Sequence, residues 1–142
     1  MQIYLLDTNI ISEPSKPIPN EKVLQKLADN LEYSCISSVT WTEILSGIKT
    51  MPDGKRKTSL FDYFIESVQK QFEILPFDAR ATNIYSDLYE QLKTKGKPAQ
   101  RFDLMIAATA ISNNLILVTR NVSDFTDIAA NSNLIIENWF EE

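Results

Sequence analysis

The sequence predicts an α/β fold with a mainly parallel central sheet. Five short apolar stretches rich in β-branched and aromatic residues have the character of strands: 2–6, 33–37, 72–77, 115–119 and 133–139. The longer segments between them carry apolar residues at helical spacing. Strands that alternate with helices are typical of a parallel sheet covered by helices on both faces. The order of the strands does not follow from this pattern.

The connecting segments carry helix signals of their own. Residues 21–31 and 78–96 each place their apolar side chains on one face, and the second begins at a capping-type Asp78 and stops at Gly96. Residues 38–48 and 57–72 predict two more helices, separated by the breaker sequence MPDG.

Two further segments complete the pattern. Residues 102–112 are apolar on nearly every side, which predicts a helix buried inside the protein. Residues 13–20 are predicted to be a proline-rich loop.

Length and composition indicate a single domain over residues 1–142. A chain of 142 residues, 44% of them hydrophobic, can bury enough apolar surface to fold without disulfides or metals. It has no run of eighteen apolar residues and no secretory signal pattern, so we expect a cytoplasmic protein without a membrane segment. The single Cys35 is expected to lie in the core.

The chain contains no histidine. This removes the usual neutral-pH general base, the histidine-activated nucleophiles and the commonest transition-metal ligand. Catalysis would have to use carboxylates, lysines, tyrosines or a hard metal. The net charge of −5 argues mildly against a polynucleotide partner, but a divalent cation can invert the sign of an acidic site.

Two acidic residues follow predicted strands. Asp7 comes directly after the first strand, and Asp124 comes a few residues after the strand at 115–119. Ligands of open α/β sheets bind at the carboxyl ends of the strands, so we expect both side chains at one edge of the sheet. The alternative is structural: Asp7 could cap a helix and Asp124 could close a turn.

Two more carboxylates are candidates for the same site. Asp103 opens the apolar helix, where it could interact with the helix dipole or act as a cap. Glu43 lies nearly opposite the apolar face of its helix, so a merely solvated glutamate is an equally good or better interpretation than a functional one. Gly47, one turn further on, leaves room for something to approach that face.

Four carboxylates in one pocket would repel each other, which would raise their pKa values or recruit cations. Oxygen ligands without histidine or cysteine indicate Mg²⁺ or Mn²⁺ rather than zinc. Such a metal can activate a water and stabilise charge on a phosphoryl oxygen. The residues therefore offer a route to phosphodiester hydrolysis without histidine.

The order of the motifs resembles the PIN-domain ribonucleases, specifically the VapC-type toxins of toxin-antitoxin modules. The segments that carry the resemblance are YLLDTNIIS, SSVTWTEILSGI, DLMIAATA and LVTRNVSDF, and together they span nearly the whole chain. Each motif is weak alone, but four in the same order are specific. The resemblance implies a three-layer α/β/α PIN-like fold and a Mg²⁺- or Mn²⁺-dependent endoribonuclease, usually a homodimer neutralised by a small antitoxin.

The resemblance also assigns residues. It places the acidic positions at Asp7, Glu43, Asp103 and Asp124, and the supporting polar positions at Thr8, Asn9, Thr119 and Asn121. It implies that Asp7 and Asp103 are the direct metal ligands, with Glu43 and Asp124 acting directly or through water. The sequence departs from the family in the loop KGKPAQRF and in AATA, where a histidine is common; neither departure touches a carboxylate.

Arg101 and Arg120 flank Asp103 and Asp124 and are candidates for RNA phosphate contacts, because guanidinium groups bind phosphates in bidentate geometry. Trp41, Phe102 and Trp139 could stack on bases, although packing is the more ordinary role for all three.

Two other functions stay open. A catalytically silent PIN-fold module could bind only a protein partner, although all four acidic positions are intact. A phosphatase or receiver on a similar sheet is the third hypothesis, but Asn9 stands where a haloacid-dehalogenase-type phosphatase would have its second aspartate. The RNA target cannot be read from the sequence, because such specificity lies in loop shape.

Overall fold

The structure, a computed structural model, describes residues 1–141; Glu142, the last residue of the predicted domain, lies outside the described residues. Its centre is a five-stranded sheet in the order β3-β2-β1-β4-β5, in which every pair is parallel. The strands are β1 (Tyr4–Leu6), β2 (Ser34–Ser37), β3 (Glu73–Leu75), β4 (Ile116–Val118) and β5 (Ile136–Glu137). Each lies inside a predicted strand segment, so the predicted parallel sheet is confirmed.

Helices connect the strands. In chain order they are α1 (Thr8–Ile11), α2 (Glu21–Asp29), α3 (Ser38–Lys49), α4 (Lys55–Asp62), α5 (Gln69–Gln71), α6 (Ala79–Thr94), α7 (Arg101–Ser112) and α8 (Thr126–Ala130). Asp78 caps α6 as predicted, since its side chain accepts the Ala81 N–H at 3.0 Å. Among residues 1–141, no helix is both long and apolar enough to cross a membrane.

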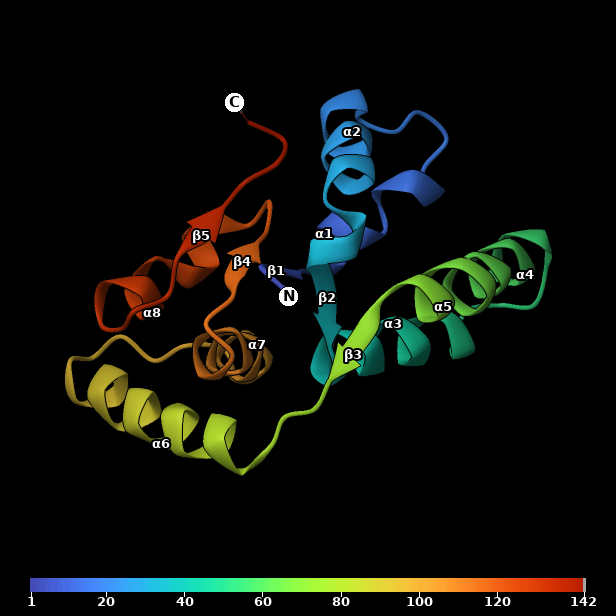
Figure 1. Cartoon of the computed structure of the whole chain (residues 1–142). Coiled ribbons are helices and arrows are strands. Elements are labelled where there is room, and N and C mark those ends of the chain that lie inside the picture. The colour runs from blue at the N-terminus through green and yellow to red at the C-terminus, as the bar shows by residue number, and fades with distance from the viewer. Residues whose placement is uncertain (142) are drawn as a thin grey trace.

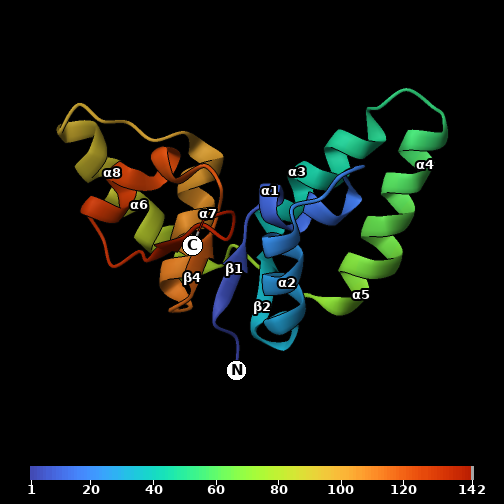
Figure 2. The same ribbon diagram turned by 90° about the horizontal axis from the view of Figure 1, so that it is seen from above.

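The helices cover both faces of the sheet. Helices α6, α7 and α8 lie on one side, whereas α1, α2, α4 and α5 lie on the other (Figures 1 and 2). Neighbouring strand residues point to opposite faces. Leu5, Cys35 and Leu117 therefore join one apolar cluster, and the residue after each of them joins a second cluster on the other face. This is the predicted three-layer α/β/α architecture.

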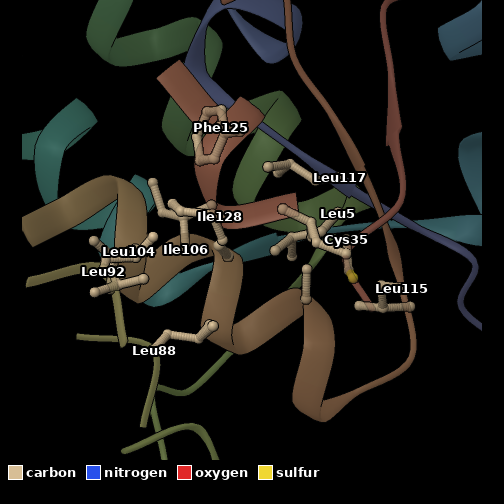
Figure 3. Packing of buried hydrophobic residues seen from close by; sticks show 14 residues of the cluster. Leu5, Cys35, Leu88, Leu92, Leu104, Ile106, Leu115, Leu117, Phe125 and Ile128 are labelled. Carbon is tan, nitrogen blue, oxygen red and sulfur yellow. The ribbon is translucent and has the colours of Figure 1, made fainter. Parts of the chain in front are cut away.

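The first cluster packs the sheet against the buried helix α7. Leu104 and Ile106 of α7 meet Leu88 and Leu92 of α6 and the ring of Phe125 in its interior (Figure 3). Seven of the twelve residues of α7 are buried, which agrees with the prediction from its continuous apolar sequence. Cys35 is fully buried in the same cluster, as expected.

The segment predicted as one helix over 57–72 is helical but irregular. A π-helical stretch, Tyr63–Val68, separates α4 from α5. The hydroxyl of Tyr63, the first residue of this stretch, donates a 2.9 Å hydrogen bond to the carbonyl oxygen of Ile11. Such a bulge changes which residues face the core, and it ties this helix to the segment that follows β1.

The proline-rich loop is more ordered than predicted. It begins with a 3₁₀ turn, Glu13–Ser15, and Glu13 is only 3% exposed. The buried carboxylate accepts the Asn20 N–H at 2.7 Å and pairs with Lys16 at 2.9 Å. Burial raises the pKa of Glu13, but this hydrogen bond and the positive charges of Lys16 and Arg120 outweigh it and hold the pKa below its ordinary value.

Strand order places a crevice at the middle of the sheet. The chain runs from β1 outward to β2 and β3, then returns to lay β4 on the other side of β1. Ligands of parallel sheets bind at such a reversal, outside the carboxyl ends of the strands. Leu6 pairs with Val118 at the ends of β1 and β4, so the next residues, Asp7 and Thr119, emerge side by side.

Candidate active site at the carboxyl end of the sheet

Asp7 is fixed at the end of β1 by hydrogen bonds on both carboxylate oxygens. Its Oδ1 accepts the N–H of Thr8 at 2.8 Å, which makes Asp7 the N-cap of α1. Its Oδ2 accepts the Thr119 hydroxyl at 2.8 Å and a longer contact from Asn9 Nδ2 at 3.5 Å. The capping alternative is therefore confirmed, but it uses one oxygen only, and the side chain retains 8% exposure.

The predicted supporting residues form one network. Thr119, fully buried, accepts the Asn121 N–H at 3.0 Å while its hydroxyl donates to Asp7. Asn9 accepts the N–H of Arg120 at 2.9 Å through Oδ1, and its Nδ2 approaches Thr119 Oγ1 at 3.4 Å. The loops after β1 and β4 are thus joined to each other, and the position of Asp7 depends on both.

Asp103 lies in the first turn of α7 but does not cap it. The N-cap is Gln100, whose side-chain oxygen accepts the Asp103 N–H at 2.9 Å. The prediction that Asp103 could act as a cap is therefore wrong. Burial raises the pKa of Asp103 to about 6, with added repulsion from the carboxylates of Asp124, Asp7 and Glu43.

Glu43 is exposed on α3. Partial burial raises its pKa, and the charge of Asp7 raises it further. The expectation of a solvent-exposed glutamate is therefore confirmed. Its interaction with Asp7 nevertheless places it at the edge of the acidic group.

Asp124 lies in the 3₁₀ turn Val122–Phe125, and its backbone N–H donates to Asn121 O at 3.0 Å. It repels Asp7, whose pKa is raised first by burial and then by this charge, against the lowering effect of the hydrogen bonds from Thr119, Thr8 and Asn9. The structure therefore brings the four predicted carboxylates into one group, in which Asp103 interacts with the other three and Asp7 interacts with Glu43 and Asp124.

The two predicted arginines differ. Arg120 is exposed, and its guanidinium lies 4.3 Å from the centre of the Phe140 ring. Arg101 is exposed at the first residue of α7. Of the aromatic candidates, Trp41 and Trp139 are buried in the core, as packing predicts, whereas Phe102 is 42% exposed.

The donor set suits a hard divalent cation. Burial, and then repulsion between the carboxylates, raises the pKa values of Asp7, Glu43 and Asp103, and a bound cation would favour their ionised forms. Within residues 1–141, no three acidic or sulfur side chains are grouped tightly enough to hold one ion between them. Mg²⁺ is commonly held by one or two carboxylates and several waters, so this spacing is compatible with it.

Three charged residues near the site were missed from the sequence. Lys16 and Arg56 line a cleft beside Thr8 and Glu43, and buried Glu13 holds Lys16. Lys16 stands in a loop between prolines and Arg56 near a helix start, so neither position has a periodic pattern that could have indicated it. The nearby sequence MPDG indicates a helix break but not a cleft.

Comparison with known proteins identifies the family. The PIN domain matches residues 4–131. Toxin FitB of Neisseria gonorrhoeae is 39% identical over 126 residues, covering 87% of this chain and 91% of FitB. The VapC ribonuclease Y4jK of Sinorhizobium fredii is 38% identical over 126 residues (87% and 90% covered), and the tRNA(fMet)-specific endonuclease VapC of Shigella flexneri is 31% identical over 136 residues (96% and 97% covered).

Solved structures agree with this assignment. The crystal structure of FitAcB from Neisseria gonorrhoeae superposes with a TM-score of 0.88 at 34% identity, covering 99% of this chain and 100% of that chain. DNA-bound VapBC from Salmonella typhimurium gives a TM-score of 0.79 at 29% identity, covering 98% and 99%. The chain therefore belongs to the PIN-domain family, among the VapC-type proteins.

Proposed function

We propose that this protein is an endoribonuclease that acts as the toxin of a toxin-antitoxin module. The observation that carries the proposal is a group of four carboxylates at the carboxyl edge of the sheet, in which Asp7, Glu43 and Asp124 all repel Asp103, in a chain without histidine. Relatives named ribonuclease and tRNA endonuclease support the same activity.

The acidic residues would hold Mg²⁺ or Mn²⁺. Asp7 and Asp103 are the proposed direct ligands, and Glu43 and Asp124 would act directly or through water. When bound, the cation would lower the pKa of a coordinated water and neutralise charge on the phosphodiester.

The chain's own residues would orient this site. The hydrogen bonds from Thr8 and Thr119 hold the Asp7 carboxylate in one orientation, and Asn9 and Asn121 hold the loop after β4 beside it. Arg120 and Arg101 are the proposed phosphate contacts. The Phe140 ring keeps the Arg120 guanidinium in place without using its hydrogen-bond donors, which stay available to a phosphate.

The proposed partners are RNA, a small antitoxin and a second copy of the chain, with 1–142 acting as one domain. Structures of similar proteins are described as FitAcB and VapBC, which supports a protein partner here as well. The acidic group suits a basic antitoxin segment by charge complementarity. Co-expression with a candidate antitoxin followed by a pull-down tests this part of the proposal.

Sequencing of RNA ends after a short pulse of expression tests the activity and identifies the target. Wild type should produce new RNA ends at a defined site, and Asp7→Asn should produce none. Equal cleavage by Asp7→Asn would exclude the proposed site. An absence of new ends with wild type would favour the silent binding module.

A further inference from the structure

A cleft of about 320 Å³ opens beside the acidic group. Thr8 and Glu43 line it, so the cleft and the proposed active site share a wall. Its remaining lining comes from the loop after α1, from α3, α4 and the connection between them, and from the π-helical stretch Tyr63–Val68. The proposed mechanism uses none of that remaining lining.

The cleft combines an apolar surface with two cations. Ile44, Ile48 and Leu60 contribute apolar surface, and Lys16 and Arg56 contribute positive charge. A volume of this size lies near the lower end of the range, about 300 to 1,000 Å³, that is typical of small-molecule pockets. The occupant should therefore be small in cross-section, partly apolar and negatively charged.

The two cations are held differently. Lys16 is fixed by its 2.9 Å ion pair with Glu13, and its side chain is still 48% exposed. Arg56 is exposed, and within residues 1–141 no carboxylate forms an ion pair with it. Arg56 therefore has its full charge available to a ligand.

Gly47 is a second feature of the cleft, because its missing side chain leaves part of the cleft unfilled. It lies inside the twelve-residue helix α3, where glycine is less favourable than alanine. A Cβ added at this position would meet no atom within 4 Å, so packing within the chain does not require a glycine. Its lack of a side chain leaves space in the cleft beside Glu43.

We propose that this cleft binds the single-stranded RNA segment next to the cleaved bond, with an unstacked base on the apolar surface and backbone phosphates at Arg56 and Lys16. The inference rests on the proposed ribonuclease activity and adds to it the residues outside the acidic group that contact the substrate. Proteins that recognise single-stranded RNA commonly place splayed bases on apolar or aromatic side chains and phosphates on cations. Continuity with the carboxylates favours the substrate over a protein ligand.

The experiment measures RNA binding in the Asp7→Asn background, so that the probe is not cut. The probe is end-labelled bulk bacterial tRNA, followed by fluorescence anisotropy between 50 and 200 mM salt. Arg56→Ala removes the free cation, with Lys55→Ala as the matched control, because Lys55 is an exposed neighbour that does not line the cleft. Lys16 is not substituted, because its removal would leave the buried Glu13 carboxylate without its ion-pair partner.

Arg56→Ala should weaken binding about five- to tenfold and reduce the slope of log K against log salt by about 0.7, the loss of one phosphate contact on a single strand. Lys55→Ala should change neither. Gly47→Leu fills the cleft with a better helix former, so it should raise the melting temperature and yet weaken RNA binding, whereas Gly47→Ala should raise the melting temperature alone.

Unchanged affinity and salt slope in Arg56→Ala would overturn the proposal, and loss of antitoxin co-purification in that variant would then assign the cleft to the antitoxin. Unchanged affinity in Gly47→Leu would also overturn it. Cleavage of total RNA by the protein with Asp7 intact separates the two proposals. If that protein cuts RNA while the cleft variants bind normally, only the cleft is wrongly assigned; if it neither binds nor cuts RNA, the proposed function fails.

Discussion

The two oxygens of Asp7 have different partners. Oδ1 caps α1, and Oδ2 accepts the Thr119 hydroxyl from the neighbouring loop. A carboxylate used only as a cap would not need a fully buried threonine from a segment 112 residues away. The second contact fixes Oδ2 and ties it to the loop after β4.

Thr119→Val should both destabilise the fold and slow RNA cleavage. The change removes the donor to Asp7 Oδ2 and the acceptor of the Asn121 N–H, so buried polar groups lose their partners. The expected loss is about 1–3 kcal/mol in the free energy of unfolding, measured by urea denaturation. Thr119→Ser retains the hydroxyl and should restore most of both properties; a valine variant as stable as wild type would contradict this role.

Asp103→Asn should stabilise the metal-free protein near pH 7. The raised pKa, about 6 against an ordinary 3.8, means that the ionised carboxylate is disfavoured in the folded state. Allowing for solvent screening, the gain should be about 1–2 kcal/mol, visible as a higher melting temperature in EDTA.

The pH dependence of this gain has a definite sign. Because the folded pKa exceeds the unfolded one, wild type loses stability as pH rises from about 4 to 6, and the full penalty remains above that window. The difference between Asp103→Asn and wild type should therefore be small at pH 4 and reach its plateau above pH 6. If the stability gain of Asp103→Asn over wild type were instead largest at pH 4, ionised Asp103 would stabilise the folded state.

At the scale of elements, α7 depends on an unusual cap. Gln100 is not among the strongly preferred N-cap residues, yet its side chain accepts the Asp103 N–H. Gln100→Ala should lower the free energy of unfolding by about 1 kcal/mol, and Gln100→Ser should restore it, as measured by chemical denaturation. An unchanged free energy of unfolding in Gln100→Ala would show that water satisfies the Asp103 N–H as well as the Gln100 side chain does.

Elements with regular periodicity were predictable from the sequence, and irregular ones were not. All five strands and the buried helix α7 follow from apolar patterning alone. The π-helical stretch at Tyr63 was missed because a bulge leaves the apolar composition of a helix unchanged. Buried Glu13 was missed because a carboxylate in a proline-rich loop has no spacing to indicate a buried partner.

The candidate site was predictable to a similar degree. The positions of Asp7 and Thr119 follow from strand ends, because parallel strands deliver their next residues to one edge. Strand order is a long-range property, so the sequence could not show that β4 lies directly beside β1. The role of Gln100 and the cleft lined by Lys16 and Arg56 depend on tertiary packing for the same reason.

At the scale of the whole molecule, the acidic group lies at the carboxyl edge of the sheet that separates two apolar cores. The strands separate the two clusters, and the carboxylates come from the end of β1, from α3, from α7 and from the turn after β4. Each helix is anchored in a core by its own apolar face. The packing of the whole fold therefore keeps the four carboxylates close together despite their repulsion. Divalent cations should therefore raise the stability of wild type more than that of Asp103→Asn.

The most direct test is cleavage of RNA by the purified protein with Mg²⁺ or Mn²⁺, compared with EDTA and with Asp103→Asn. The account predicts metal-dependent cleavage that EDTA stops, and at least a hundredfold slower cleavage by Asp103→Asn although that variant folds more stably. Cleavage that persists in EDTA, or an Asp103→Asn variant that cuts RNA as fast as wild type, would contradict it.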